Sequence, residues 1–171
     1  MTRVLIVSDS HGLSRELMEI KTRHQVDYHI HCGDSELEYH SEPLQGYYKV
    51  RGNCDFDRNF PEEEIIQLDG MKFLVVHGHL HGVKFGHGTL IARAKEVDAD
   101  VVCYGHTHIA LATKEDNHLI INPGSIVYPR GSFPEKTYAI LEWEKRDELR
   151  VNFFTVDGNN CGTLDYTTSL A

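Results

Sequence analysis

Short apolar runs rich in Val, Ile and aromatic residues recur along the chain, and five of them lead into a residue that can bind a metal ion. Runs of this length and composition predict buried β-strands. The five runs are Val4–Val7, Tyr28–Cys32, Tyr47–Val50, Phe73–Val76 and Val101–Tyr104. The polar groups that follow them are Asp9-Ser10-His11, Gly33-Asp34, Gly52-Asn53, His77-Gly78-His79 and His106-Thr107-His108.

The first half of the chain alternates between predicted strands and helices, which favours a parallel sheet covered by helices. Leu13, Leu17 and Ile20 lie at helical spacing, and Asp69-Gly70 is a strong hairpin signal. The predicted strands are Arg3–Ser8, Asp27–His31, Gly46–Arg51, Glu64–Leu68, Met71–Val76 and Ala99–Tyr104, and the predicted helices are Leu13–Arg23 and Gly88–Val97.

After Gly105 the pattern changes to hairpins. Ile109–Thr113 and His118–Ile121 are joined by Glu115-Asp116-Asn117, and Tyr138–Trp143 and Leu149–Phe154 flank the charged segment Glu144–Glu148. A helical half followed by a hairpin half predicts two packed sheets with helices outside, in a single domain over residues 1–171. The segment 157–171 is polar and rich in Gly, Asn and Thr, so we expect a loose C-terminal tail.

Composition and charge exclude several classes of protein. The chain is 40% hydrophobic and 25% charged, and no run approaches the roughly 18 apolar residues of a membrane span. We therefore expect a cytoplasmic protein that binds no membrane. The formal net charge of −9 argues against a stable duplex nucleic-acid surface. It leaves a phosphate substrate open, because two divalent ions would add about four positive charges at the site.

The cysteines indicate neither a zinc ribbon nor a disulfide framework. Cys32, Cys54, Cys103 and Cys161 are scattered, with no C-x-x-C pair. Cys32 and Cys103 fall at strand ends, where we expect them to be small core residues.

Each strand-end group has a simpler structural alternative when taken alone. Asp9-Ser10-His11 could cap the following helix, and Asp34 or Asn53 could be plain turn residues. The paired imidazoles at His77-Gly78-His79 and His106-Thr107-His108 have fewer such explanations. Because ligands bind beyond the carboxyl ends of strands in α/β sheets, the five groups together favour one shared metal site.

The chemistry of these side chains indicates the kind of ion. Asp, Asn and His without thiolate suit Mn²⁺, Fe, Zn²⁺ or Ni²⁺, whereas Mg²⁺ and Ca²⁺ rarely take so many imidazoles. Seven donors are too many for one tetrahedral zinc but fit two ions about 3.5–4 Å apart, the clamp used for in-line phosphoryl displacement.

The order of the motifs resembles the calcineurin-like metallophosphoesterases, in particular their small bacterial and archaeal phosphodiesterase branch. The matching motifs are Asp9-x-His11, Gly33-Asp34, Gly52-Asn53-x-Asp55, His77-Gly78-His79, Gly105-His106-x-His108 and Asn122-Pro123-Gly124-Ser125, which span about two thirds of the chain.

This resemblance implies an α/β fold: a four-layer α/β/β/α sandwich of two mixed β-sheets with helices on the outer faces. It implies that Asp9, His11 and His108 hold one metal. Asn53, His77 and His106 would hold the other, with Asp34 bridging the pair. The implied nucleophile is a bridging hydroxide whose pKa is lowered by the two cations.

One position departs from the family pattern. Many members have His directly after the Gly-Asn pair, where it acts on the leaving group, but this chain has Cys54. A thiol, with an unperturbed pKa of about 8.5, is a poorer proton donor than imidazolium near neutrality, so the identity of the general acid stays open. We expect Asp55 to hold a ligand histidine rather than a metal.

Further polar residues near the motifs are weaker candidates. His79 could line the pocket or contact phosphate, and it joins Asn53, Cys54 and Asp55 as a catalytic candidate. His81 and His87 are predicted to be loop residues. Arg130 could reach a substrate phosphate, although a solvated arginine is the favoured interpretation.

The sequence therefore predicts a dinuclear phosphodiesterase or phosphatase that acts on a small-molecule phosphoester. Mn²⁺ is the expected ion, with Ni, Fe or Zn as alternatives, and a homo-oligomer is left open. The competing hypothesis is an interaction scaffold, because one branch of the family, the retromer subunit, keeps the fold with an eroded metal site. The full Asp/Asn/His set argues against erosion. A nucleotide-binding regulator is disfavoured by the absence of a G-x-G-x-x-G or G-x-x-x-x-G-K-[ST] loop.

Overall fold

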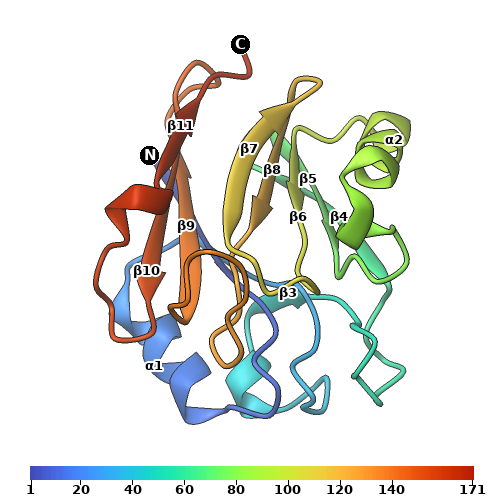
Figure 1. Ribbon diagram of the computed structural model, residues 1–171, viewed down its shortest axis with the longest axis vertical. Helices are drawn as coiled ribbons and strands as arrows, with labels where there is room; N and C mark the ends of the chain where they lie inside the picture. Colours follow the sequence, from blue (N-terminus) through green and yellow to red (C-terminus); the bar gives the residue numbers. More distant parts are fainter.

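Two mixed β-sheets stack face to face in the computed structural model, which describes residues 1–171 (Figure 1). The first sheet has six strands in the order β11-β10-β9-β1-β2-β3. Its strands are β1 (Thr2–Val7), β2 (Tyr28–His31), β3 (Tyr47–Lys49), β9 (Thr137–Trp143), β10 (Leu149–Thr155) and β11 (Tyr166–Thr168). β1, β2 and β3 are parallel to one another, and β9 runs antiparallel to β1.

The second sheet has five strands in the order β4-β5-β6-β8-β7. Its strands are β4 (Glu63–Leu68), β5 (Met71–Val76), β6 (Val101–Cys103), β7 (Leu111–Glu115) and β8 (His118–Asn122). β5, β6 and β8 are parallel, and the edge strands β4 and β7 pair antiparallel to them as hairpins.

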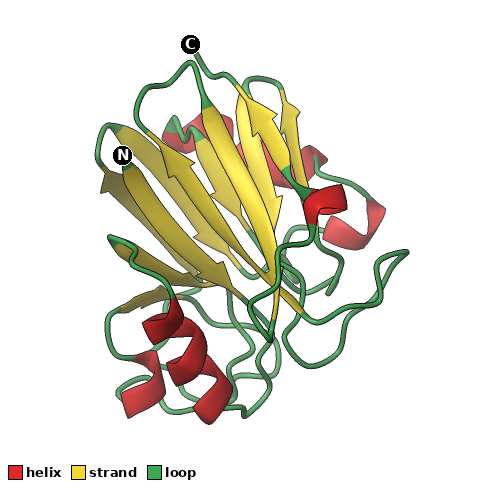
Figure 2. Ribbon diagram, turned by 90° about the vertical axis from the view of Figure 1, so that its left-hand side faces the viewer, coloured by secondary structure: helices red, strands yellow, loops and turns green.

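The central strands are buried on both faces, which is why they appear in the sequence as continuous apolar runs. In β1, Val4 and Ile6 belong to the core between the sheets, whereas Leu5 and Val7 pack in the cluster that contains helix α1 (Arg15–Arg23). On the other side, helix α2 (Gly88–Val97) packs against the second sheet. Figures 1 and 2 show the helices outside the sheets, so the layers are α1, first sheet, second sheet and α2.

The predicted elements form, with shifts at their ends. Helix α2 has the predicted bounds. Helix α1 begins two residues later than predicted, at Arg15, and Leu13 packs on the core from outside the helix. The turn between β7 and β8 has two residues rather than three. Asp116 and Asn117 both have positive φ, as a type I′ hairpin requires, and Glu115 therefore remains in the strand.

The expectation of a loose C-terminal tail is wrong. Strand β11 pairs with β10, and Leu170 is only 3% exposed against the core between the sheets. Lys114 of the second sheet donates hydrogen bonds to the Tyr166 hydroxyl and, through its ammonium group, to the Ser169 carbonyl. A few spaced apolar residues suffice to dock this segment, although its average composition is polar.

Neither helix has the length and apolar character that crossing a membrane would require.

Candidate metal centre

The loops after β1, β2, β3, β5 and β6 meet at one edge of the sheet pair and are tied together through their backbones. The Asp9 amide donates to the Gly33 carbonyl at 3.0 Å, and the Gly105 amide donates to the His77 carbonyl at 2.9 Å. Gly52 lies so close to the β2 loop that a Cβ there would be 2.0 Å from Asp34 Oδ1. Packing of this kind brings together polar side chains that are far apart in the sequence.

The backbone of these loops is strained at the predicted ligands. Positive φ is uncommon outside glycine and clusters at functional sites, where the surrounding structure enforces it. Six non-glycine residues of the loops have positive φ, namely Asp9, His11, Asp34, Glu36, His106 and His108. The loops thus hold these side chains in directions that relaxed strand ends would not give them.

Asp9, His11 and His108 form the first group of donors. His108 Nε2 lies 3.1 Å from Asp9 Oδ1, and His11 Nε2 lies 3.8 Å from the same oxygen. Asp9 is fully buried, and neither its Oδ1 nor His11 Nε2 has a hydrogen-bond partner. A buried polar atom without a partner costs about 1–3 kcal/mol, more when charged. These orphaned atoms fit a cation placed between them.

Asp34, Asn53 and His77 form the second group. His77 Nε2 lies 3.1 Å from both Asp34 Oδ2 and Asn53 Oδ1. Asp34 Oδ2 is also 4.0 Å from His11 Nε2, and Asp9 Oδ1 is 3.7 Å from His77 Nε2, so both carboxylates lie between the two groups. The His106 ring lies 5.2 Å from the His77 ring, centroid to centroid. The seven predicted donors therefore gather in one place.

Hydrogen bonds set which nitrogen of two of these rings faces the carboxylates. His77 Nδ1 lies 2.7 Å from the Cys32 carbonyl, and His108 Nδ1 lies 2.7 Å from the Tyr128 carbonyl. Because a carbonyl only accepts, Nδ1 carries the proton in each ring, and Nε2 is left to face the carboxylates. Metal-binding histidines are oriented in this way.

The electrostatics of the pocket favour positive charge. Burial acts to raise the pKa of Asp34, but the hydrogen bond and charge of His77 outweigh it and bring the pKa to about 2. Burial likewise opposes ionisation of Asp9, yet His108 and His77 leave its pKa lowered. For His77 burial acts to lower the pKa, while Asp34 and Asp9 raise it overall.

Asp55 does not hold a ligand histidine, contrary to the sequence-based expectation. Its carboxylate accepts three backbone amide bonds, from Gly52 at 2.7 Å and from Asp34 and Glu36 at 2.8 Å each. A buried carboxylate satisfies amides that a tight pair of loops leaves without strand partners. Asp55 therefore joins the β2 and β3 loops and positions the backbone of Asp34.

Cys54 and His79 lie at the margin of the donor set. The Cys54 side chain is exposed, and its backbone amide donates to Asp34 Oδ1 at 2.8 Å. Partial desolvation and the neighbouring Asp34 raise the pKa of the thiol to about 11, so it is neutral near pH 7. His79 has a buried Nδ1 without a partner, and its ring lies 5.4 Å from that of His77.

The structure adds contacts that sequence reasoning missed. Glu36 Oε1 lies 2.6 Å from His11 Nδ1, and Ser8 Oγ donates to Asp9 Oδ2 at 2.6 Å. Ser125, in a motif that the sequence analysis quoted without a role, donates its hydroxyl to the Asp9 carbonyl at 2.8 Å. No local pattern marks Tyr128, which is 20 residues beyond His108 and still supplies the carbonyl that orients this ring.

Other candidate residues lie outside the donor set. His87 is a loop residue, as predicted, and it bonds to Glu115 and to the Tyr104 hydroxyl. Arg130 is exposed. His31 is buried in β2. Its Nε2 lies 2.8 Å from Oγ of Ser10, the residue between Asp9 and His11.

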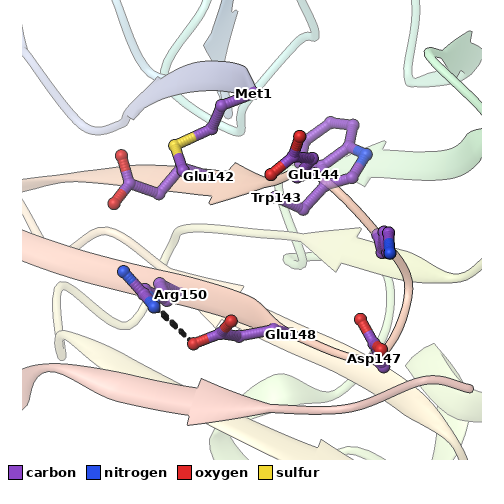
Figure 3. A pocket seen from close by; sticks show the side chains of 8 residues that line it. Met1, Glu142, Trp143, Glu144, Asp147, Glu148 and Arg150 are labelled. Carbon is purple, nitrogen blue, oxygen red and sulfur yellow. Dashed lines mark hydrogen bonds and ion pairs between the residues drawn. The ribbon is translucent and has the colours of Figure 1, made fainter.

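A separate hollow of about 350 Å³ lies at the turn between β9 and β10 (Figure 3). It is lined by Met1, which precedes β1, whereas Asp9 follows β1, so the two sites lie at opposite ends of this strand. Glu148 and Arg150 form an ion pair within the lining (Figure 3). The hollow takes no part in the metal centre.

A family model described as a calcineurin-like phosphoesterase superfamily domain matches residues 2–146. The chain belongs to this superfamily. It is 47% identical over 169 residues to the probable metallophosphoesterase YsnB of Bacillus subtilis, covering 98% of this chain and 99% of that protein. It is 31% identical to the phosphodiesterase MJ0936 of Methanocaldococcus jannaschii, covering 85% of this chain and 95% of that protein.

Solved structures agree with the observed architecture. A predicted phosphoesterase from Streptococcus pneumoniae superposes with a TM-score of 0.94 at 36% identity, covering 98% of this chain and 97% of that one. The α/β architecture of two mixed sheets with outer helices, implied by the family resemblance, is thereby confirmed. At the level of the family the protein is a probable metallophosphoesterase, and its buried Asp and His clusters are consistent with a divalent metal site.

Proposed function

We propose that the protein is a phosphodiesterase that depends on two divalent transition-metal ions. The observation that carries the proposal is the pair of orphaned buried atoms, Asp9 Oδ1 and His11 Nε2. They lie among the carboxylates and imidazoles of the groups Asp9-His11-His108 and Asp9-Asp34-His77. Such donors suit Mn²⁺ best, with Ni, Fe or Zn as alternatives. A diester is favoured over a monoester because the relative MJ0936 is named a phosphodiesterase.

The residues divide into two ligand sets. Asp9, His11 and His108 would hold one ion, and Asn53, His77 and His106 would hold the other. Asp34 lies between His11 and His77 and would bridge the two. When bound, the ions would supply positive charge. This charge would activate a water molecule and offset the negative charge on the phosphoryl oxygens.

The protein's own groups then orient the substrate. His79, at the margin of the second set, would contact the substrate phosphate. Cys54 occupies the position from which family members act on the leaving group, and its backbone amide holds Asp34. Asp55 keeps the β2 and β3 loops in register without touching substrate. We expect the substrate to be a small phosphoester and the protein to act in the cytoplasm.

The test is metal-dependent hydrolysis. Protein purified without chelator is analysed for metal content and assayed on bis(p-nitrophenyl) phosphate and on p-nitrophenyl phosphate. We expect faster cleavage of the diester, loss of activity after exhaustive chelation, and recovery when Mn²⁺ is restored. Asp9→Asn is the loss-of-ligand variant, and Asp147→Asn, an exposed site at the β9–β10 turn, is its matched control.

Full activity after complete removal of metal would overturn the proposal. Absence of hydrolysis with every ion and ester would favour the alternative of an interaction scaffold.

A further inference from the structure

We propose that Glu36 is a positioning residue for the metal ligand His11, so that its charge sets the affinity of one of the two metal sites. The inference rests on the proposed function, because it assigns a role within the same metal centre. It concerns a side chain that the donor set does not include.

The His11 ring presents its two nitrogens to different groups. Nδ1 lies 2.6 Å from Glu36 Oε1, a short charge-assisted hydrogen bond. Nε2 faces Asp9 Oδ1 at 3.8 Å and Asp34 Oδ2 at 4.0 Å, and it has no hydrogen-bond partner. With its proton on Nδ1, shared with Glu36, the ring offers the Nε2 lone pair to a cation held by Asp9 and Asp34.

Glu36 differs from the groups that orient the other ligand histidines. His77 and His108 each bond through Nδ1 to a backbone carbonyl, which is neutral and cannot be changed by mutation of its own side chain. His11 instead bonds to a carboxylate. A carboxylate partner makes an imidazole a stronger electron donor than a neutral carbonyl does, and such partners tune metal affinity.

The placement of Glu36 is enforced by the surrounding backbone. Its φ is +54°, a conformation that glutamate rarely adopts. Asp55 Oδ1 accepts the Glu36 amide at 2.8 Å, and this carboxylate also accepts the amides of Asp34 and Gly52. One buried group therefore positions both the bridging carboxylate and the residue that orients His11.

Glu36 lies outside the ligand set itself. Its side chain is 41% exposed, whereas that of His11 is 12% exposed. It contacts His11 on the Nδ1 side of the ring, away from the Nε2 atom that faces Asp9 and Asp34. Glu36 can therefore be replaced without removing a donor from either proposed site.

The consequence is a selective change in metal affinity. Replacement of such outer partners weakens metal binding by roughly 10- to 100-fold. Glu36→Gln keeps an acceptor but loses the charge, so it should weaken one site by about tenfold. Glu36→Ala loses both and should weaken it more, with the other site unchanged.

The experiment compares the wild type, Glu36→Gln, Glu36→Ala and Glu38→Gln. Glu38 is an exposed glutamate two residues further along the same loop and controls for net charge. Each protein is stripped with chelator, checked for fold by thermal unfolding, and titrated with Mn²⁺ and Zn²⁺ by calorimetry. In the same metal-free samples, ¹⁵N NMR reports which nitrogen of His11 carries the proton.

We expect two binding steps in the wild type and in Glu38→Gln, and one weakened step in both Glu36 variants. We expect the His11 Nδ1 proton of the wild type to lose its downfield, hydrogen-bonded position in Glu36→Ala. Unchanged affinities in folded Glu36→Ala, or an equal loss in Glu38→Gln, would overturn the inference. A wild type that binds no metal would defeat the proposed function instead, and the NMR comparison would still decide whether Glu36 holds His11.

Discussion

Asp9 and Asp34 are the side chains on which the chemistry of the centre depends. Both carboxylates are buried, and a buried charge is stable only when it is paired or bound to a cation. Against the effect of burial, His108 and His77 keep the pKa of Asp9 low, and His77 keeps that of Asp34 low. The site is therefore built to remain anionic at neutral pH and to attract divalent ions.

Asp34→Ala should be the most damaging replacement of a ligand. Asp34 is the proposed bridge and approaches both His11 and His77, so its loss removes a donor from both proposed sites. We expect a folded protein with at most one tightly bound metal and little turnover, measured by elemental analysis and diester hydrolysis. Asp147→Ala is the control. Two bound metals with near-normal turnover would show that Asp34 does not bridge.

Cys54→Ala tests whether the thiol acts as an acid. The contact of this residue with Asp34 is made by its backbone amide, which alanine retains. We expect the variant to lose less than the roughly 10²–10⁴-fold typical of a missing general acid. Both proteins should cleave aryl diesters much faster than alkyl ones, since a phenolate leaves without a proton. A thousandfold loss confined to alkyl esters, at full metal occupancy, would identify the thiol as the acid.

At the level of elements, the site depends on how closely strand ends approach one another. The β2 and β3 loops are joined through the Asp55 carboxylate, and Gly52 leaves no room for a side chain beside Asp34. Gly105, in the loop after β6, is similarly confined, because a Cβ there would lie 2.1 Å from Ser8 Oγ. Glycine is required at both positions for close approach of the backbone.

Gly52→Ala should therefore displace Asp34 and weaken metal binding. Overpacking of this kind typically destabilises by about 1–3 kcal/mol. Gly88→Ala is the matched control. Gly88 is the first residue of helix α2, and no atom lies within 4 Å of a Cβ added there. We expect Gly88→Ala to be neutral or slightly stabilising, measured by thermal unfolding and metal titration. Equal behaviour of the two variants would contradict the steric argument.

For the whole molecule, contacts at the end opposite the metal centre tie the two sheets together. Arg146, in the β9–β10 turn of the first sheet, pairs with Asp100 at 2.6 Å, just before β6 of the second sheet. The Leu170 amide donates to the Arg146 carbonyl, so the C-terminal segment meets the same junction. The Asp100 side chain is 21% exposed, so solvent screens this ion pair only in part.

The ion pair should make stability depend on pH. Burial acts to raise the pKa of Asp100, but the hydrogen bond and charge of Arg146, together with the Lys72 amide, outweigh it, and the pKa is lowered. Since the unfolded pKa of Asp is about 3.9, the ionised group stabilises the fold above that pH. The contribution is lost as the pH falls through the folded pKa.

The measurement is thermal unfolding of the wild type, Asp100→Asn and Asp147→Asn between pH 7 and pH 2. We expect Asp100→Asn to be less stable than the wild type at pH 7, with the difference shrinking below about pH 4. Asp147→Asn should follow the wild type throughout. A difference for Asp100→Asn that stays constant over the whole range would rule out the ion pair as its source.

The sequence by itself determined the helices, the strands up to β10 and the chemical nature of the site. Apolar runs such as Val4–Val7 and Phe73–Val76 mark strands buried on both faces, and helix α2 follows its pattern from end to end. The donor side chains could be named because each directly follows such a run, and their ordered motifs indicated the superfamily. The positions of strands and helices and the types of donor side chain depend on neighbouring residues, so they can be predicted from the order of residues along the chain.

Only the tertiary structure decided which groups meet. The pairing of β11 with β10, the amide contacts of Asp55 and the bond between Glu36 and His11 join residues that no periodicity connects. They depend on backbone directions at strand ends, including positive φ at Asp9, His11 and Glu36, which packing enforces against local preference. The types of metal donor are therefore local information, whereas their orientation and support arise from contacts between loops.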